Sequence, residues 1–141
     1  MHRALLAGTA YFVSLFALGF ALGAVRVLLL APNVGPFAAT LIEAPLMLIA
    51  AWFLCRWAIR GWRAPGSYAA RWAMALWFFA LLAAFETALG AALFGRSPAQ
   101  QLADLLNPAG LLGLTLQIMA ALLPLFVERK SLAAPEVKSR K

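Results

Sequence analysis

The stretch Thr40-Leu-Ile-Glu43-Ala-Pro45-Leu-Met47 decides the fold, because it places a carboxylate and a proline inside a long apolar run. Residues 37–57 are apolar enough to cross a bilayer as a helix, which satisfies its own backbone hydrogen bonds. Pro45 leaves the carbonyl of Leu41 without its helical donor and favours a kink. Either this kink is a packing feature, or the carbonyl meets a polar group or water from a neighbouring helix. Both interpretations place further helices beside this one.

The composition indicates an integral membrane protein. Of the 141 residues, 65% are hydrophobic and 12% are charged, whereas soluble domains carry about 45–50% apolar and about 25% charged residues. The formal net charge of +7 could indicate a nucleic-acid partner, but the cations stand at the ends of apolar runs and not in a water-facing patch. We therefore expect the lipid bilayer as a partner, and no nucleic acid.

Cysteine and histidine are too few for the common cofactor sites. The single cysteine, Cys55, excludes an internal disulfide or a CxxC motif, and the single histidine, His2, leaves no pair of axial ligands for haem. The sequence also contains no Ser/His/Asp set, no HExxH motif and no phosphate-binding loop. It therefore predicts no cofactor, no metal site and no enzyme activity.

Four apolar segments predict an all-α, polytopic membrane protein with four transmembrane helices in an antiparallel bundle. These segments form one transmembrane domain, residues 1–130, and span residues 4–30, 37–57, 69–94 and 108–127. A basic start followed by an apolar run also fits a signal peptide. The first run exceeds 20 residues, however, and the apolar part of a signal peptide is only about 7–15 residues long, so we expect a retained helix.

The segments between and after these spans carry turn and capping signals. Turn-forming residues at 31–36 predict a break after the first helix. Ser97-Pro98-Ala-Gln100 has the form of a capping box with proline at the first helical position. It predicts a short amphipathic helix over residues 98–106 at the outer membrane surface. Residues 131–141 are polar and basic, and we expect a disordered cytoplasmic tail.

Each predicted span contains one strongly polar residue: Arg26, Glu43, Glu86 and Gln117, in chain order. In three spans this residue shares a helical face with glycines that permit close helix packing: Arg26 with Gly19 and Gly23, Glu86 with Gly90, and Gln117 with Gly110 and Gly113. The last span, residues 108–127, contains Pro124, which predicts a second kink besides the one at Pro45. We therefore expect the polar residues to face the interior of the bundle.

The depths of the polar residues predict an intramembrane polar layer. At about 1.5 Å per residue from the outer helix ends, Arg26 lies about 7 Å deep, Glu43 about 9 Å, Gln117 about 12 Å and Glu86 about 13 Å. An unpaired charge at the bilayer centre costs about 2.5–3.5 kcal/mol on insertion scales, so Arg26 is expected to pair with Glu43. One arginine cannot neutralise two carboxylates, so Glu86 is expected to be the group that takes up a proton.

The cations are distributed asymmetrically. One side of the predicted membrane carries Arg96, and the other carries ten: Arg3, Arg56, Arg60, Arg63, Arg71, Arg129, Lys130, Lys138, Arg140 and Lys141. The positive-inside rule then places both termini and the middle loop in the cytoplasm. All five tryptophans flank that loop, as expected of an interfacial aromatic belt.

A resemblance supports this topology. The run Gly23-Ala-Val-Arg26-Val-Leu, then Pro32-x-x-Gly35 and Glu43-Ala-Pro45-Leu-Met47, resembles a group of small, uncharacterised four-helix inner-membrane proteins of bacteria. The resemblance covers most of the chain and implies a multi-pass location in a bacterial inner membrane. It implies no activity and no site residues.

Two functions remain open from the sequence. A buried polar layer can fix helix register and partner choice, which suits a structural or accessory membrane component. Intramembrane glutamates such as Glu43 and Glu86 can instead serve a proton-coupled transporter or a small channel. A homo-oligomer or a larger membrane complex is compatible with either function.

Overall fold

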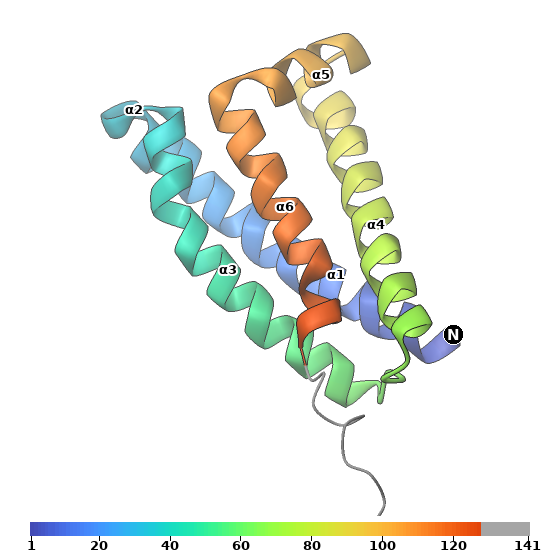
Figure 1. Cartoon of the computed structure of the whole chain (residues 1–141). Helices are drawn as coiled ribbons and strands as arrows, with labels where there is room; N and C mark the ends of the chain where they lie inside the picture. Colours follow the sequence, from blue (N-terminus) through green and yellow to red (C-terminus); the bar gives the residue numbers. More distant parts are fainter. Residues whose placement is uncertain (128–141) are drawn as a thin grey trace, which may run out of the picture.

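The chain folds into four long helices with a short helix at one end (Figure 1). The structure is a computed structural model that describes residues 1–127. The end of the predicted domain, 128–130, and the predicted tail, 131–141, lie outside the described residues. The helices are α1 (His2–Val25), which continues through a π-helical segment η1 (Arg26–Leu30) into α2 (Ala31–Val34), then α3 (Pro36–Gly61), α4 (Tyr68–Phe94), α5 (Pro98–Leu106) and α6 (Pro108–Phe126). The all-α prediction is confirmed.

The first helix extends beyond its predicted end. The turn-forming residues at 31–36 were expected to end it at residue 30, but it remains helical to Val34 and only Gly35, at φ 82°, breaks it. The backbone widens into π-helix over Arg26–Leu30, where the N–H of Ala31 bonds to the carbonyl of Arg26. Pro32 then occupies the first turn of α2, where a missing N–H costs no helical bond. The break was predicted over residues 31–36, but in the structure only Gly35 separates the two helices.

The remaining helices begin at the residues that the capping signals indicate. The side chain of Ser67 accepts from the N–H of Ala70 at the start of α4, and Ser97 and Gln100 form the predicted capping box of α5. The Asn107 side chain accepts from the N–H of Gly110 at 2.8 Å and caps α6. Local sequence chemistry therefore sets these boundaries.

The four long helices form an antiparallel bundle in which each packs on two others. Helix α1 contacts α3 and α4, and α6 contacts the same two helices from the opposite side. The chain thus consists of two helical hairpins, α1–α3 and α4–α6. The N-terminus, the α3–α4 connection and the end of α6 lie at one end of the bundle, and α2 and α5 lie at the other (Figure 1).

Buried apolar side chains concentrate in the half of the bundle near the N-terminus. We call that end the basic end, because five of the seven arginines in residues 1–127 gather there: Arg3, Arg56, Arg60, Arg63 and Arg71. The opposite end is called the α5 end. The largest fully buried side chains include Tyr11, Phe78 and Met74, and the rings of Tyr11 and Phe78 stack at 4.5 Å. Towards the α5 end residues 83–88 of α4 are all exposed, so the tight core stops partway along the bundle.

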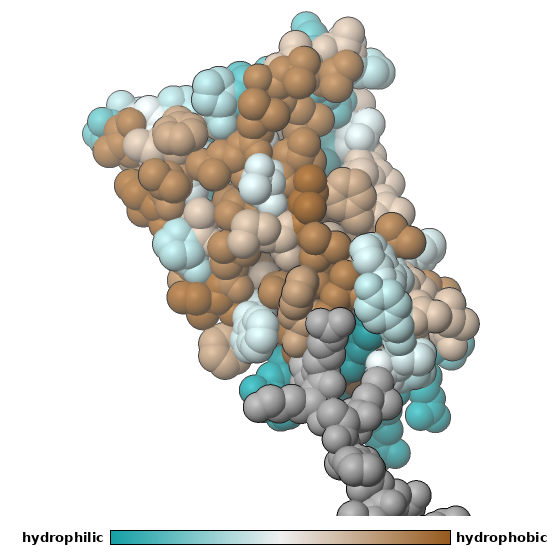
Figure 2. Space-filling model, in the orientation of Figure 1, coloured by the Kyte–Doolittle hydropathy of each residue, from teal (hydrophilic) through white to brown (hydrophobic). Residues whose placement is uncertain are grey.

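The outer surface of the helices is apolar and suited to lipid. Four helical stretches are long and apolar enough to cross a membrane: His2–Val34, Pro36–Gly61, Tyr68–Phe94 and Pro108–Phe126. Figure 2 shows apolar residues over most of one face, with hydrophilic residues at its upper and lower ends. A surface with this much exposed hydrophobic area is stable in contact with acyl chains and not with water. The protein is a multi-pass integral membrane protein in contact with the lipid bilayer.

Candidate functional site

The first polar pair joins the π-helical segment to α3. The Arg26 Nε lies 2.8 Å from the Glu43 Oε2, and the two side chains are 30% and 14% exposed. The Arg26 Nη1 also donates to the hydroxyl of Thr40 at 3.2 Å, and this hydroxyl donates to the carbonyl of Pro36 at 2.9 Å. The contact between Arg26 and Glu43 is the one expected from the sequence.

Thr40 is a member of this site to which the sequence analysis assigned no role. It stands three residues before Glu43, and residues three apart share a helical face, which is the signal that could have identified it. Its hydroxyl accepts from Arg26 while donating within its own helix, so it adds a second acceptor for the guanidinium. The arginine is thus held by a carboxylate and a hydroxyl of α3.

Arg26 stands at the first residue of the π-helical segment. Short π-helical segments inside α-helices are uncommon and frequently occur at functional sites, because they re-aim a side chain. Here the widened turn sits directly before the reversal at Gly35 that brings α3 back alongside the first helix. Periodicity in the sequence does not reveal such a segment, since it assumes a uniform helix.

The second polar pair joins α4 to α6. The Gln117 Nε2 donates to the Glu86 Oε1 at 2.5 Å. Glu86 stands one turn beyond Leu82, and Gln117 one turn before Ala121, and both of those residues belong to the apolar core. Each polar side chain therefore continues the core-facing stripe of its helix towards the α5 end.

The structure arranges the four predicted residues as two separate pairs. Arg26 and Glu43 lie in the first hairpin, and Glu86 and Gln117 lie in the second. Over residues 1–127, no hydrogen bond or ion pair joins one pair to the other. Each pair bridges the two helices of one hairpin, on the α5 side of the tight core.

A third polar contact across the bundle links helices that lie diagonally opposite. The hydroxyl of Tyr11 in α1 donates to the carbonyl of Ala120 in α6 at 2.9 Å. This carbonyl is the one that would accept from residue 124 in an unbroken helix, and residue 124 is proline. Tyr11 was not among the predicted site residues. No signal in the sequence links this tyrosine to Ala120, 109 positions away.

The predicted kink and packing residues have distinct surroundings. Both α3 and α6 continue as single helices through Pro45 and Pro124. A Cβ on Gly19 would lie 3.2 Å from the Met47 methyl carbon of α3. Gly90 faces the side chain of Gln101, with only 2.8 Å between a Cβ and its Cδ.

The other glycines divide into close and open positions. Gly110 packs against the backbone of α5, whereas a Cβ on Gly23 or Gly113 would meet nothing within 4 Å. Gly8 was not among the predicted packing residues, but a Cβ there would lie 3.3 Å from both the Met74 carbonyl oxygen and the Trp77 ring. Gly8, and not Gly23, thus marks a close approach of the first helix to a neighbour.

The chemistry available to these groups is that of charge pairing and hydrogen bonding. Among residues 1–127, no group of three or more His, Cys, Asp or Glu side chains is placed to hold a metal ion. At the α5 end, a further ion pair joins Arg96 to Asp104 at 2.7 Å, with both side chains about half exposed. The Arg26–Glu43 and Glu86–Gln117 pairs are the contacts that involve the four predicted polar residues.

Comparison with known proteins adds no family. No family model, no curated protein and no solved structure matches this chain. The resemblance drawn from the sequence is supported at the level of architecture, a small membrane protein with four long apolar helices.

Proposed function

We propose that this protein is a structural or accessory component of a bacterial inner membrane, with both termini in the cytoplasm. The observation that carries the proposal is the placement of each polar pair within one hairpin. Arg26–Glu43 ties the first two spans together, and Glu86–Gln117 ties the last two together.

Polar contacts of this kind stabilise membrane bundles at positions where apolar packing is weak. Helices in lipid gain little from the hydrophobic effect, and interhelical hydrogen bonds between polar side chains contribute about 0.6 kcal/mol on average and up to about 2 kcal/mol. Both pairs lie on the α5 side of the tight core, where α4 exposes residues 83–88. Each hairpin is then held at both ends, by the core at the basic end and by a polar pair further along.

The native mass and composition of the full chain, purified from its own membrane in mild detergent, test this proposal. An accessory component is expected to retain another membrane protein at fixed stoichiometry. A homo-oligomer with nothing attached favours the transporter or channel instead. A monomer that carries nothing, and whose deletion leaves the composition of every membrane complex unchanged, contradicts the proposal.

The second candidate function is a proton-coupled transporter or small channel that uses Glu43 and Glu86. The observation that favours it is the exposure of Glu86, whose side chain lies outside the tight core although it bonds to Gln117. A carboxyl group reachable from the α5 end could take up and release a proton. Flux of protons into vesicles that contain the pure protein tests this function, with Glu86→Gln as the inactive variant. Equal flux in both proteins removes Glu86 from any such mechanism.

A further inference from the structure

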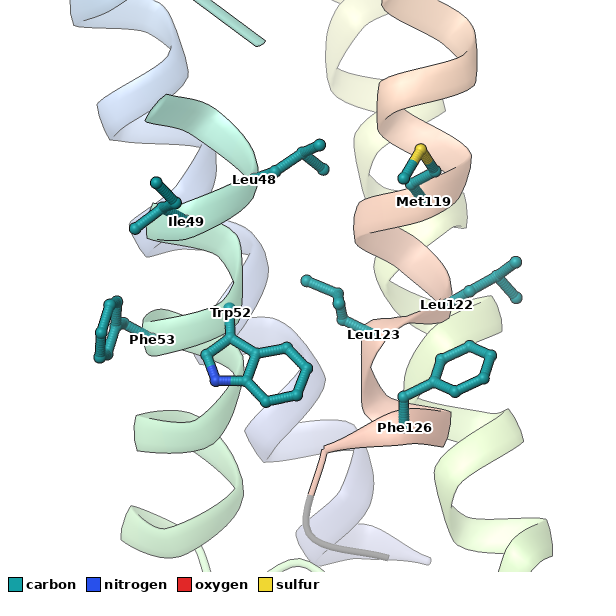
Figure 3. A pocket seen from close by; sticks show the side chains of 8 residues that line it. All are labelled: Leu48, Ile49, Trp52, Phe53, Met119, Leu122, Leu123 and Phe126. Atoms are coloured by element: carbon teal, nitrogen blue, oxygen red, sulfur yellow. The ribbon is translucent and has the colours of Figure 1, made fainter. Parts of the chain in front are cut away.

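An apolar groove runs along the outside of the bundle between α3 and α6. Its volume is about 490 Å³, within the range of roughly 300–1,000 Å³ typical of small-ligand sites. The lining residues are all apolar or aromatic: Leu48, Ile49, Trp52, Phe53, Met119, Leu122, Leu123 and Phe126. Figure 3 shows Leu48 and Trp52 of α3 and Leu123 of α6 projecting into the space between the two helices. The groove faces the membrane, so its natural occupant is apolar.

The α3 side of the groove ends in positive charge. Leu48, Trp52, Arg56 and Arg60 follow one another at intervals of four residues, so each lies beside the next along a row that is inclined to the helix axis. The first two line the groove, and the two arginines continue the same row towards the basic end. Both arginine side chains are exposed. Along this row the residues are apolar near the middle of the helix and cationic at the basic end. A phospholipid has the same order, with its acyl chain towards the membrane centre and its headgroup at the surface.

The aromatic residues place this change at the membrane interface. Tryptophan is enriched at the level of the lipid headgroups, where its ring is apolar and its N–H is polar. Trp52 stands one turn before Arg56, and Trp57 and Trp62 pack edge to face at 5.3 Å beside it. Arg56 is therefore at the depth at which a phosphate would lie when an acyl chain occupies the groove.

A second groove on the other side of α6 provides a comparison. It has a volume of about 260 Å³ and lies between α4 and α6, with Trp72 and Leu76 among its lining residues. One turn from Trp72 towards the basic end stand Tyr68 and Ala69, which carry no positive charge. Of these two grooves, the one between α3 and α6 combines an apolar lining with basic residues that follow it on the same helical row.

We propose that the groove between α3 and α6 binds one anionic phospholipid, with an acyl chain against Leu48, Trp52 and Leu123 and the headgroup phosphate at Arg56 and Arg60. Basic pockets at the cytoplasmic ends of membrane helices are suited to acidic headgroups, and each arginine near the surface contributes about a fivefold preference. The site lies in the opposite half of the span from the two polar pairs. It is consequently independent of the role proposed for them.

Native mass spectrometry of the full chain tests the proposal. The protein is equilibrated in mild detergent with equal amounts of phosphatidylglycerol and phosphatidylcholine of the same acyl chains, and the lipid retained by each molecule is identified. We expect one phosphatidylglycerol to be retained in preference to phosphatidylcholine. Arg56→Gln and Arg60→Gln should each lower this preference about fivefold. Arg3→Gln is the matched control, because it removes the same charge at the same end of the bundle from another helix.

A groove-filling variant separates a lipid site from a general attraction to charge. Ile49 is 57% exposed, so Ile49→Trp adds volume to the groove without compressing the core. It should abolish retention of phosphatidylglycerol while leaving the unfolding transition unchanged. Equal retention of the two lipids, or an equal loss in the Arg3→Gln control, overturns the proposal. A dimer that Ile49→Trp dissociates also overturns it, because a second copy of the chain would then occupy the groove.

Discussion

The hydroxyl of Tyr11 donates a 2.9 Å hydrogen bond to the carbonyl of Ala120, the acceptor that Pro124 leaves without a helical donor. A proline inside a membrane helix creates an unsatisfied carbonyl that lipid cannot solvate. Here the first helix supplies the missing donor to the last one across the diagonal of the bundle. The contact explains why a fully buried phenol is compatible with a core that is otherwise apolar.

Tyr11→Phe should destabilise the bundle by about 1–3 kcal/mol, because it leaves the Ala120 carbonyl without a partner in a buried position. The free energy of unfolding in mixed detergent micelles measures the loss. Tyr68→Phe is the matched control, since Tyr68 is 63% exposed and should cost little. In a Pro124→Ala background the restored N–H can satisfy Ala120, so Tyr11→Phe should cost less there. Equal costs in both backgrounds would show that the hydrogen bond does not compensate for the proline.

Arg26→Ala should lower the yield of folded protein and its stability, because it leaves Glu43 largely buried without its counter-charge. Removing one partner of a buried ion pair costs about 3–5 kcal/mol, and the partial exposure of Arg26 places the expected loss near the lower limit. Arg96→Ala provides the control, since the pair of Arg96 with Asp104 is about half exposed and such pairs contribute at most about 1 kcal/mol. Similar yields and unfolding free energies for the two variants would contradict a structural role for Arg26.

Gly8→Val should separate α1 from α4 and destabilise the bundle by about 1–3 kcal/mol. The reason is steric, since a Cβ at Gly8 already lies 3.3 Å from the backbone oxygen of Met74. Gly23→Val is the control, because a Cβ there meets nothing within 4 Å. Unfolding free energies measured side by side distinguish the two positions. A larger loss of stability for Gly23→Val than for Gly8→Val would indicate that another protein chain packs against the first helix at Gly23.

The contrast between Gly8 and Gly23 illustrates which features the sequence could predict. Composition, hydrophobic runs and capping residues indicate the number of spans and most of their ends, because these depend on local chemistry. The contact of Arg26 with Glu43 could also be predicted. The two residues lie on consecutive spans at similar depth, and an unpaired charge in the membrane is costly. Packing glycines depend instead on which helices are neighbours, and periodicity carries no such information.

Long-range contacts and local irregularities of the helices could not be predicted from the sequence. Tyr11 and Ala120 are 109 positions apart, and no local pattern connects them. The π-helical segment at Arg26–Leu30 and the helical turn through Pro32 lie directly before the reversal at Gly35, and helical periodicity does not indicate either of them. The convergence of the four polar residues was expected from their similar depths. The division into two pairs follows from the order of the helices around the bundle, which depth does not determine.

Glu86 and Gln117 provide the test of whether the second pair acts as a unit. Glu86→Gln keeps an oxygen that can accept from Gln117, so stability should be retained. Glu86→Leu removes the acceptor and should cost about 0.6–2 kcal/mol, the range measured for interhelical hydrogen bonds in membranes. The double variant Glu86→Leu with Gln117→Leu should recover most of this loss, because replacing both partners by apolar groups leaves no polar atom unsatisfied. Unfolding free energies of Glu86→Leu, Gln117→Leu, the double variant and the parent protein complete the cycle. Additive losses in the double variant would mean that the two side chains stabilise the protein independently, and the second hairpin would then be held by contacts other than this pair.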